Sequence, residues 1–503
     1  MTTNPTQPKK TVWKQRFEAV WKMLEIIQGR YEKAQEDKAA DDNATVLARK
    51  KTIVALLNRL EAFSRRHYTF FAQSFTEEQT GHPRIILERP QSLSDDYIFG
   101  TILEQVSNDL AVIQRASEQR MIGEQQGRGT TIDTFNLADR LAMSALKRVG
   151  HLLECDSTVL TYLLKSPNIR VIPYAPVAMI GIPMTCYGIT ETGVGRDLLA
   201  IPHELGHHLY WNGRKEENTQ PTENFLRHQI RNSLRLNSTP QWLQKWLEEI
   251  FADVVSCWIG GPITALSFQD LQLQTRDDGF LVDNGVHPIA ALRPYIYSET
   301  FRQLGMKKVA EQLEQRWWNK LQTLDVLAQA CDPKQPFAFT PFHLPNSDKP
   351  ERILDPLQDI LDFGIINQCI EVLVSSQNSA NDLPAAMWVG NQIDQHDFAI
   401  EKDVQNFYGH FEEWVKDGIL QMDSPPDLCE TPTTWCDIVK ARGVAFDIDT
   451  LEGKQMPPEE LITLLCQWDK DELPETAQPL LLKEWRPIFE FAGWTTEGPH
   501  GRN

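Results

Sequence analysis

The sequence predicts a mainly α-helical protein with a small α+β core and helical domains before and after it. Apolar residues recur every three or four positions through long segments, which is the period of amphipathic helices. One central stretch, at about residues 168–190, is instead rich in β-branched and apolar residues bounded by proline and glycine, as strands are. Hydrophobic residues make up 41% of the 503 positions and charged residues 24%, which is typical of a protein with an ordinary buried core.

These patterns divide the chain into four regions. Residues 1–10 are a polar tail that we expect to be disordered, and residues 11–165 form a helical N-terminal region. Residues 166–300 form the α+β core. Residues 301–503 form a helical, acidic C-terminal region, which begins with a helix expected over residues 302–330.

The N-terminal region is predicted to contain long helices. Apolar residues keep the helical period from about residue 11 to residue 75, and the polar break at residues 41–43 predicts two helices in a hairpin. Residues 83–93 are expected to form a short extended connector. The helical period returns over residues 95–126 and 136–164.

The core is predicted to place strands before a helix that carries the sequence HELGHHLYW. Within residues 179–190 we expect an edge strand, because Pro183 cannot donate a hydrogen bond inside a central ladder. Pro202 lacks an N–H group, so the next helix should begin within a turn of His203. A second helix is expected over residues 240–259, where a Gly-Gly-Pro sequence ends it.

The net charge makes nucleic acid and anionic membranes poor partners. Lys and Arg number 50 against 69 Asp and Glu, a formal charge of -19, and a field of that sign repels phosphate groups. The charge is uneven, with 14 basic against 8 acidic residues in positions 1–70 and 9 against 21 in positions 401–503. The basic segment could contact an acidic partner, but docking on the acidic C-terminal part is the interpretation that we prefer.

Cysteine usage and hydropathy predict a soluble, cytoplasmic protein. The eight cysteines are scattered and include no C-x-x-C pair, which in a chain of this length is typical of reduced, buried thiols. The first residues show no apolar segment of a secretory signal. Residues 171–190 carry no charge, but their three prolines exclude an ordinary membrane-spanning helix.

The residues that carry chemistry are His203, Glu204 and His207 in the sequence HELGH. Positions i and i+4 of a helix lie on one face, so both imidazoles can reach one ion. Glu204 lies beside the first histidine and can act as general base, which is the arrangement of HExxH zinc sites. Gly206 lowers helix propensity inside the motif, which indicates close packing or close approach of a ligand. The alternative is that the motif is a coincidence.

A catalytic zinc requires a third protein ligand and an open fourth position. Glu249 and Asp253 lie four residues apart in WLEEIFADVV, on one face of a predicted helix. Glu249 could bind the metal, while Asp253 accepts a hydrogen bond from a ligand imidazole and fixes its orientation. The alternative is an amphipathic helix with surface acids, but the apolar residues around the pair favour partial burial.

The sequence VHPIAALRPY adds three candidate residues. His287 could stabilise the oxyanion that forms when water attacks a carbonyl, and Arg293 and Tyr295 are further candidate contacts of the substrate or oxyanion. The alternatives are a structural histidine and an arginine that pairs with a carboxylate. Cys186 could be a thiolate ligand of a latent form, although a buried, inert cysteine is the simpler interpretation.

Taken together, these residues resemble the gluzincin metallopeptidases. HELGH is followed 42 residues later by the glutamate of EIFAD, and HP-x-x-x-x-R at residues 287–293 is similar to the soluble core of CAAX-prenyl-endopeptidase-type and heat-shock-type metallopeptidases. Minimal gluzincins of the ImmA/IrrE type are a second comparison. The resemblance covers about residues 168–300 and implies a zincin-like core.

By position, the resemblance implies roles for individual residues. His203, His207 and Glu249 would bind Zn²⁺, Glu204 would be the base, and Asp253 would orient a ligand. His287 would contact the oxyanion or substrate. The family pattern also implies that an edge strand holds the peptide by its main chain, a role expected for residues 179–190.

We therefore expect a cytoplasmic zinc metallopeptidase that hydrolyses peptide bonds of a protein or peptide substrate. The flanking helical regions suggest control by a regulatory protein or ligand, and the protease could be latent until that partner binds. A hypothesis of a different class is a metal-stabilised interaction protein without hydrolytic activity.

Overall fold

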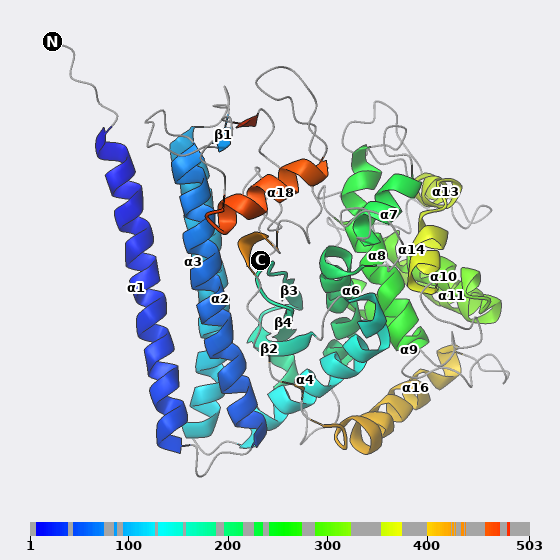
Figure 1. The fold of residues 1–503 in the computed structure, drawn as a ribbon. Helices are drawn as coiled ribbons and strands as arrows, with labels where there is room; N and C mark the ends of the chain where they lie inside the picture. Colours follow the sequence, from blue (N-terminus) through cyan, green and yellow to red (C-terminus); the bar gives the residue numbers. More distant parts are fainter. Residues whose placement is uncertain are drawn as a thin grey trace.

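The computed structural model describes most of the chain, and all structural statements below refer to the described residues. These are residues 7–38, 44–74, 85–87, 94–125, 129–153, 157–187, 196–214, 226–234, 241–273, 287–322, 354–374, 400–423, 425–426, 428, 434–436, 438, 458–472 and 480–482. The described part is mainly helical with a small mixed sheet, as the sequence predicts (Figure 1). Most of the expected polar tail lies outside these ranges, and the first helix begins at Gln7.

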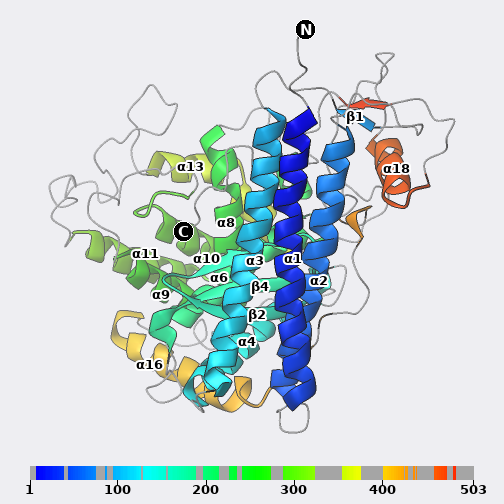
Figure 2. The same cartoon turned by 90° about the vertical axis from the view of Figure 1, so that its left-hand side faces the viewer.

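The N-terminal region is a layer of three long helices. These are α1 (Gln7–Lys38), α2 (Ala44–Ser74) and α3 (Asp95–Gln125), and they stand side by side (Figure 1 and Figure 2). The apolar positions at helical spacing are the buried ones, for example Phe17 and Leu24 on α1. The predicted helix hairpin and the helix at residues 95–126 are confirmed.

A three-stranded sheet lies behind this layer of helices. Its strands are β2 (Thr158–Leu164), β3 (Asn168–Arg170) and β4 (Val177–Pro183), in the order β2-β4-β3. β4 pairs in parallel with β2 and antiparallel with β3. The prediction of an edge strand at residues 179–190 is therefore wrong, because β4 is central and the edges of the sheet are β2 and β3. Pro183 is tolerated since it is the last residue of β4.

The sheet separates two hydrophobic cores, and successive side chains of β4 point alternately into one core and the other. Val177 and Met179 face the N-terminal core, which also contains Phe17, Leu60 and Tyr174. The neighbouring positions Ala178, Ile180 and Ile182 face the second core, hereafter the site core, together with Leu205 and Ile250. Both faces of the central strand β4 are thus buried, and all seven of its residues are apolar.

One predicted helix turned out to be partly strand. The helix expected over residues 136–164 ends as α4 (Gly129–Val149), and a short 3₁₀ turn and β2 follow. The β2 sequence TVLTYLL is rich in β-branched and aromatic residues, which favour a strand buried on both faces. Periodicity alone does not distinguish such a short apolar run from a helix.

The site core is helical. Its elements are α6 (Ile201–Asn212), α7 (Leu226–Ser233), α8 (Gln241–Gly260), α9 (Pro262–Gln272), α10 (Arg293–Gln303), α11 (Lys307–Gln322), α13 (Leu354–Asp362), α14 (Ile365–Val374), α16 (Ile400–Trp414) and the π-helical turn η7 (Val415–Ile419). The helix expected over residues 302–330 is broken after α10, where Gly305 has a φ of 86° that favours glycine. Buried residues of α14 and α16 belong to the same apolar cluster as those of α6 and α8.

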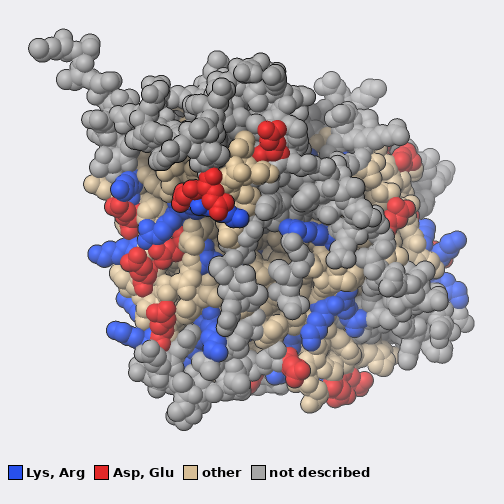
Figure 3. All heavy atoms as spheres, viewed as in Figure 1, with Lys and Arg blue, Asp and Glu red and all other residues tan. Residues whose placement is uncertain are grey.

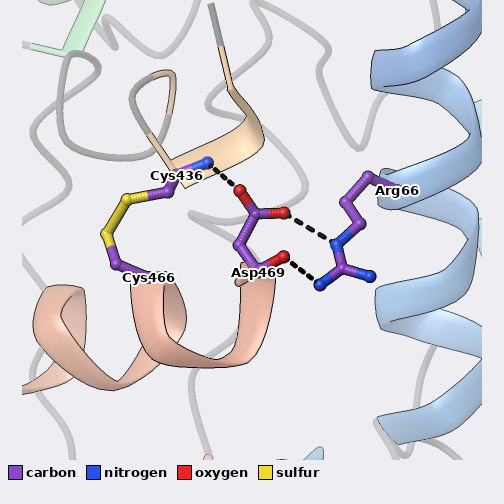
Figure 4. Close-up of a disulfide and its surroundings, with 4 residues drawn as sticks. All are labelled: Arg66, Cys436, Cys466 and Asp469. Carbon is purple, nitrogen blue, oxygen red and sulfur yellow. Dashed lines mark hydrogen bonds and ion pairs between the residues drawn. A yellow bond between two sulfur atoms is a disulfide. The ribbon is translucent and has the colours of Figure 1, made fainter. Parts of the chain in front are cut away.

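The C-terminal part reaches back to the N-terminal helices. β5 (Leu480–Leu482) pairs in parallel with β1 (Ile85–Leu87), within the expected extended connector. α18 (Pro458–Asp469) lies against α2, where Arg66 Nε donates to Asp469 Oδ1 at 2.7 Å (Figure 4). Contact between the basic N-terminal region and the acidic C-terminal part is therefore observed at this point.

Two cysteines are paired, contrary to the expectation of reduced thiols. Cys436 and Cys466 form a disulfide, and the Cys436 N–H donates to Asp469 Oδ2 at 2.9 Å (Figure 4). Their separation of 30 residues gives no recognisable spacing, so only the docking of α18 brings them together. Cys186, Cys257 and Cys369 are free and buried, as predicted.

On the face shown in Figure 3, basic and acidic side chains are interspersed over the N-terminal helices. No helix in the described part of the chain is long and apolar enough to cross a membrane.

Candidate metal centre

The two helices that carry the candidate ligands, α6 and α8, pack unusually closely. A Cβ atom added at Gly206 would lie 2.5 Å from Ala252 Cα and 3.1 Å from its carbonyl oxygen. Such distances leave room only for glycine, so the close packing predicted for this position is confirmed. The contact brings the HELGH turn of α6 directly against the Glu249–Asp253 turn of α8. Pro202 lies in the first turn of α6, as expected.

Three side chains from these helices converge on one point. Single ligand atoms of His203, His207 and Glu249 all lie within 4.8 Å of one another. The two Nε2 atoms are 3.3 Å apart, and they lie 3.5 and 3.6 Å from the Glu249 carboxylate oxygens. His207 and Glu249 are buried, with exposed fractions of 4% and 2%.

Two carboxylates contact the imidazoles at Nδ1, the ring nitrogen that does not face the shared point. His203 Nδ1 lies 3.0 Å from Asp253 Oδ1, which is the contact that the sequence predicts. His207 Nδ1 lies 2.8 Å from Glu248 Oε1, a partner that the sequence analysis missed. These contacts leave both Nε2 atoms facing the shared point, because a ring that donates from Nδ1 offers Nε2 as a lone pair.

Arg293 pairs with carboxylates, which is the alternative foreseen for it. Its Nε and Nη2 atoms donate to the two oxygens of Asp253 at 2.8 and 2.9 Å. Nη2 also lies 2.9 Å from Glu249 Oε2 and 3.0 Å from His203 Nε2. The guanidinium therefore compensates the buried acids and shares two of the atoms that would bind a metal.

The buried charges shift one another's pKa values. Burial and Arg293 lower the pKa of His203, but contacts with Asp253 and Glu249 outweigh them and raise it to about 9. Burial raises the pKa of Glu249, but the charges of His207 and Arg293 hold it well below the usual range. Because zinc binds a histidine through an unprotonated ring nitrogen, a metal ion would compete with the proton that the raised pKa favours on His203.

The group opens into a cavity of about 590 Å³. Glu204, His203, His207 and Glu249 line its floor. The lining also includes Phe268 of α9, and residues of β3 and of the turn before it. Glu204 is buried, with 8% exposed, and it lines the cavity beside His203.

His287 and two tyrosines, Tyr295 and Tyr297, differ in whether they line this cavity. His287 lines the cavity with 40% of its side chain exposed, and its Nε2 lies 3.4 Å from Glu249 Oε1. Tyr295 is buried and is not among the residues that line the cavity, whereas Tyr297 is. On α10 these residues are two apart, so their side chains point to different sides. The structure therefore brings Tyr297, and not the predicted Tyr295, to the cavity.

Two other residues near the motif, His208 and Cys186, are buried, and burial is the simpler interpretation given above for Cys186. His208 is buried, and Asn212 Nδ2 lies 3.2 Å from its Nδ1. Cys186 lies in the site core, and burial raises the pKa of its thiol to about 12. Among the described residues, Cys186 does not belong to the metal-binding group.

Comparison with known proteins adds no further assignment. No family model, no curated protein and no solved structure matches the chain. The functional interpretation therefore depends on the residues and geometry of the site.

Proposed function

We propose that the protein is a zinc-dependent metallopeptidase that hydrolyses peptide bonds of a protein or peptide substrate. The observation that carries the proposal is the convergence of His203, His207 and Glu249 at the floor of a cavity, beside the carboxylate of Glu204. Two imidazoles and one carboxylate form a ligand set typical of catalytic zinc.

The distances between the candidate ligand atoms can be compared with those in a tetrahedral zinc site. Atoms bound at about 2.0–2.1 Å in a tetrahedral site lie about 3.3–3.4 Å apart. The two Nε2 atoms are 3.3 Å apart, and the Glu249 carboxylate approaches each of them with a different oxygen, Oε2 at 3.5 Å from His203 and Oε1 at 3.6 Å from His207. When bound there, zinc would polarise the carbonyl of the substrate and make water more acidic.

Glu204 is proposed to move the protons of the reaction. One of its carboxylate oxygens would take a proton from the attacking water and pass it to the leaving nitrogen. His287, which lines the cavity, would contact the substrate or the oxyanion. Asp253 and Glu248 would keep the two imidazoles in the ligating tautomer.

The cavity supports an extended peptide as substrate. Asn168 and Ile169 of the edge strand β3 line it, so a peptide could add to this edge by main-chain hydrogen bonds. This assigns to β3 the role that the sequence gave to residues 179–190. The flanking helical regions are proposed to restrict access or to receive a regulatory protein or ligand.

A cytoplasmic location is proposed from the three buried free thiols, Cys186, Cys257 and Cys369. The Cys436–Cys466 disulfide counts against it, because structural disulfides are rare in the cytosol. Alkylation of thiols in intact cells before lysis, followed by mass spectrometry, would show in which state this pair exists.

Glu204→Gln tests the proposed reaction directly. We expect the variant to keep one zinc per chain and to cleave a peptide library roughly 10²- to 10⁴-fold more slowly than wild type, the range for a general acid–base group. Glu314→Gln is the matched control, since Glu314 pairs with Arg302 on the surface of α11. An unchanged rate in Glu204→Gln would remove Glu204 from the mechanism.

The same experiment separates the interaction-protein hypothesis from the protease. A wild-type protein with bound zinc that cleaves no library peptide, and whose partner binding is unaffected by Glu204→Gln, would support a non-hydrolytic role. Cleavage that appears only after addition of a cell extract, and is absent in Glu204→Gln, would support a latent protease.

A further inference from the structure

One face of α9 lines the cavity that contains the candidate metal centre. The residues of this helix that line the cavity recur every three or four positions, so they share one helix face: Thr264, Ser267, Phe268, Leu271 and Gln272. Phe268 is partly buried, and Leu271 is 37% exposed. Part of the surface of both large apolar side chains is therefore left uncovered at the cavity.

The ring of Phe268 is fixed beside the candidate ligands. It stacks on the ring of Tyr297, with centroids 4.6 Å apart and an interplanar angle of 13°. Arg293 Cζ lies 4.8 Å from the centroid of the same ring, and Arg293 Nη2 donates to Glu249 Oε2 at 2.9 Å. The apolar surface of α9 thus begins one residue away from the group that would bind a metal.

The 3₁₀ turn η3 (Arg196–Ala200) extends this apolar surface toward α6. Ser267 Oγ donates to the Arg196 carbonyl at 3.2 Å, which connects α9 to the turn. Leu199 and Ala200 of the turn also line the cavity, and α6 begins at the next residue. Together, Leu199, Ala200, Phe268 and Leu271 form what we call the apolar wall.

The apolar wall is unsuited to a charged group. None of the described lining residues on α9 is charged. Asp197 of η3 lines the cavity as well, but its Oδ2 already accepts a hydrogen bond from Thr185 Oγ1. A charged side chain laid on this wall would lose hydration without gaining an ion pair, whereas an apolar side chain would gain by leaving water.

We propose that the apolar wall is a specificity subsite, which receives a large apolar side chain of the peptide substrate next to the cleaved bond. The cavity, of about 590 Å³, lies within the range of pockets that enclose a ligand of several side chains. Continuity of the wall with the candidate metal centre puts this side chain close to the reacting carbonyl. The inference rests on the proposed function, because it assigns a substrate preference to the same site.

Peptide binding to Glu204→Gln in the presence of zinc tests the subsite without requiring cleavage. The probes are fluorescein-labelled peptides of one glycine- and alanine-rich sequence with a single variable residue, which is leucine, alanine, glutamate or lysine. Fluorescence anisotropy should show that the leucine peptide binds about tenfold or more tightly than the alanine peptide, since even one methylene in an apolar pocket has an effect of this size. The glutamate and lysine peptides should bind no better than the alanine peptide.

Leu271→Glu, made in the Glu204→Gln protein, should remove this preference. A carboxylate on the wall should lower the affinity for the leucine peptide about tenfold and leave that for the alanine peptide unchanged. Leu420→Glu is the matched control, because Leu420 is also 37% exposed but does not line the cavity. If Leu271→Glu does not fold, Leu271→Ala should shift the affinity for the leucine peptide in the same direction.

Two binding results would overturn the subsite. One is equal affinity for the four peptides, or tightest binding of a charged one. The other is the same loss of leucine-peptide affinity in the Leu271 and Leu420 variants.

Cleavage of the same peptides by the wild-type protein separates this inference from the proposed function. Cleavage that requires Glu204 but is equally fast for all four peptides would overturn the subsite and keep the peptidase. Selective binding of the leucine peptide without any cleavage would keep the subsite and contradict the peptidase.

Discussion

The two sides of the central sheet both bury charged residues, but they do so in different ways. On the N-terminal side, Asp109 is 1% exposed and receives hydrogen bonds from Arg170 Nε at 2.5 Å and from the Tyr174 hydroxyl at 3.1 Å. On the site side, Asp253 is fully buried and receives two bonds from Arg293. Taken alone, the two ion pairs look equivalent.

Their surroundings distinguish them. Burial raises the pKa of Asp109 and outweighs the charge of Arg170, whereas Arg293 and His203 together overcome burial and lower the pKa of Asp253. The site group also borders the 590 Å³ cavity, and Asp109 does not. Buried charge is therefore not a functional signal by itself; the signal is the convergence of imidazoles and a carboxylate on an accessible cavity.

Zinc affinity should show the largest difference between the two sides of the sheet. We expect Glu249→Ala to lower zinc affinity by about 10³-fold or more, because one of three protein ligands is lost. Asp109→Asn, the matched change on the other side of the sheet, should leave zinc affinity unchanged. Competition with a fluorescent chelator measures both. Loss of zinc in Asp109→Asn, or its retention in Glu249→Ala, would contradict the assignment of the centre.

The two arginines offer a test of stability rather than binding. Arg293→Met and Arg170→Met each leave a buried carboxylate without its cation, so each should lower the free energy of unfolding by about 3–5 kcal/mol. Only Arg293→Met should also change zinc affinity, since Arg293 contacts Glu249 and His203. Urea denaturation with and without zinc separates the two effects. A zinc effect in Arg170→Met would contradict the distinction between the two sides.

The sequence contains enough information for the centre of the site but not for its surroundings. The four-residue spacings of His203 to His207 and of Glu249 to Asp253 fix which side chains share a helix face, so the ligand set and one orienting acid are predictable. Glu248 was missed because it lies 100° around α8 from Glu249, and only the angle at which α6 crosses α8 brings it to His207.

The errors in the fold have the same origin. Pro183 marks a position without an N–H group, which occurs at the end of a central strand as well as on an edge strand. The pairing of Cys436 with Cys466 and the choice of Tyr297 over Tyr295 depend on contacts between segments that are distant in the chain. Local sequence patterns predict helices, strands and the faces that they bury. The order of strands and the contacts between segments distant in the sequence are set by tertiary packing.

Glu248→Gln should have a smaller effect on zinc affinity than the loss of a ligand. The amide can still contact His207 Nδ1 but carries no charge, so zinc affinity should fall about 10- to 100-fold, the range for an outer partner of a ligand. Glu299→Gln, which changes a carboxylate that pairs with Arg302, is the control. An unchanged affinity in Glu248→Gln would mean that His207 is oriented by packing alone.

The smallest effect is expected from His67, a buried histidine of the N-terminal side. Trp435 Nε1 donates to His67 Nδ1 at 3.1 Å, and burial lowers the pKa of His67 to about 3. Below pH 6.5 the unfolded chain binds a proton that the folded protein does not. Stability from this residue is therefore complete above pH 6.5 and decreases by about 1.4 kcal/mol per pH unit as the pH falls toward 3.

His67→Gln isolates this contribution, because glutamine can still accept the tryptophan hydrogen bond but does not titrate in this range. The free energy of unfolding in urea should fall by about 1 kcal/mol more in wild type than in the variant between pH 6.5 and pH 5.5, because the unfolded histidine is already half protonated at pH 6.5. All other groups titrate in both proteins, so the difference reports His67 alone. Equal pH dependence would mean that His67 has the same pKa in the folded and the unfolded protein, so that burial on the N-terminal side does not exclude its proton.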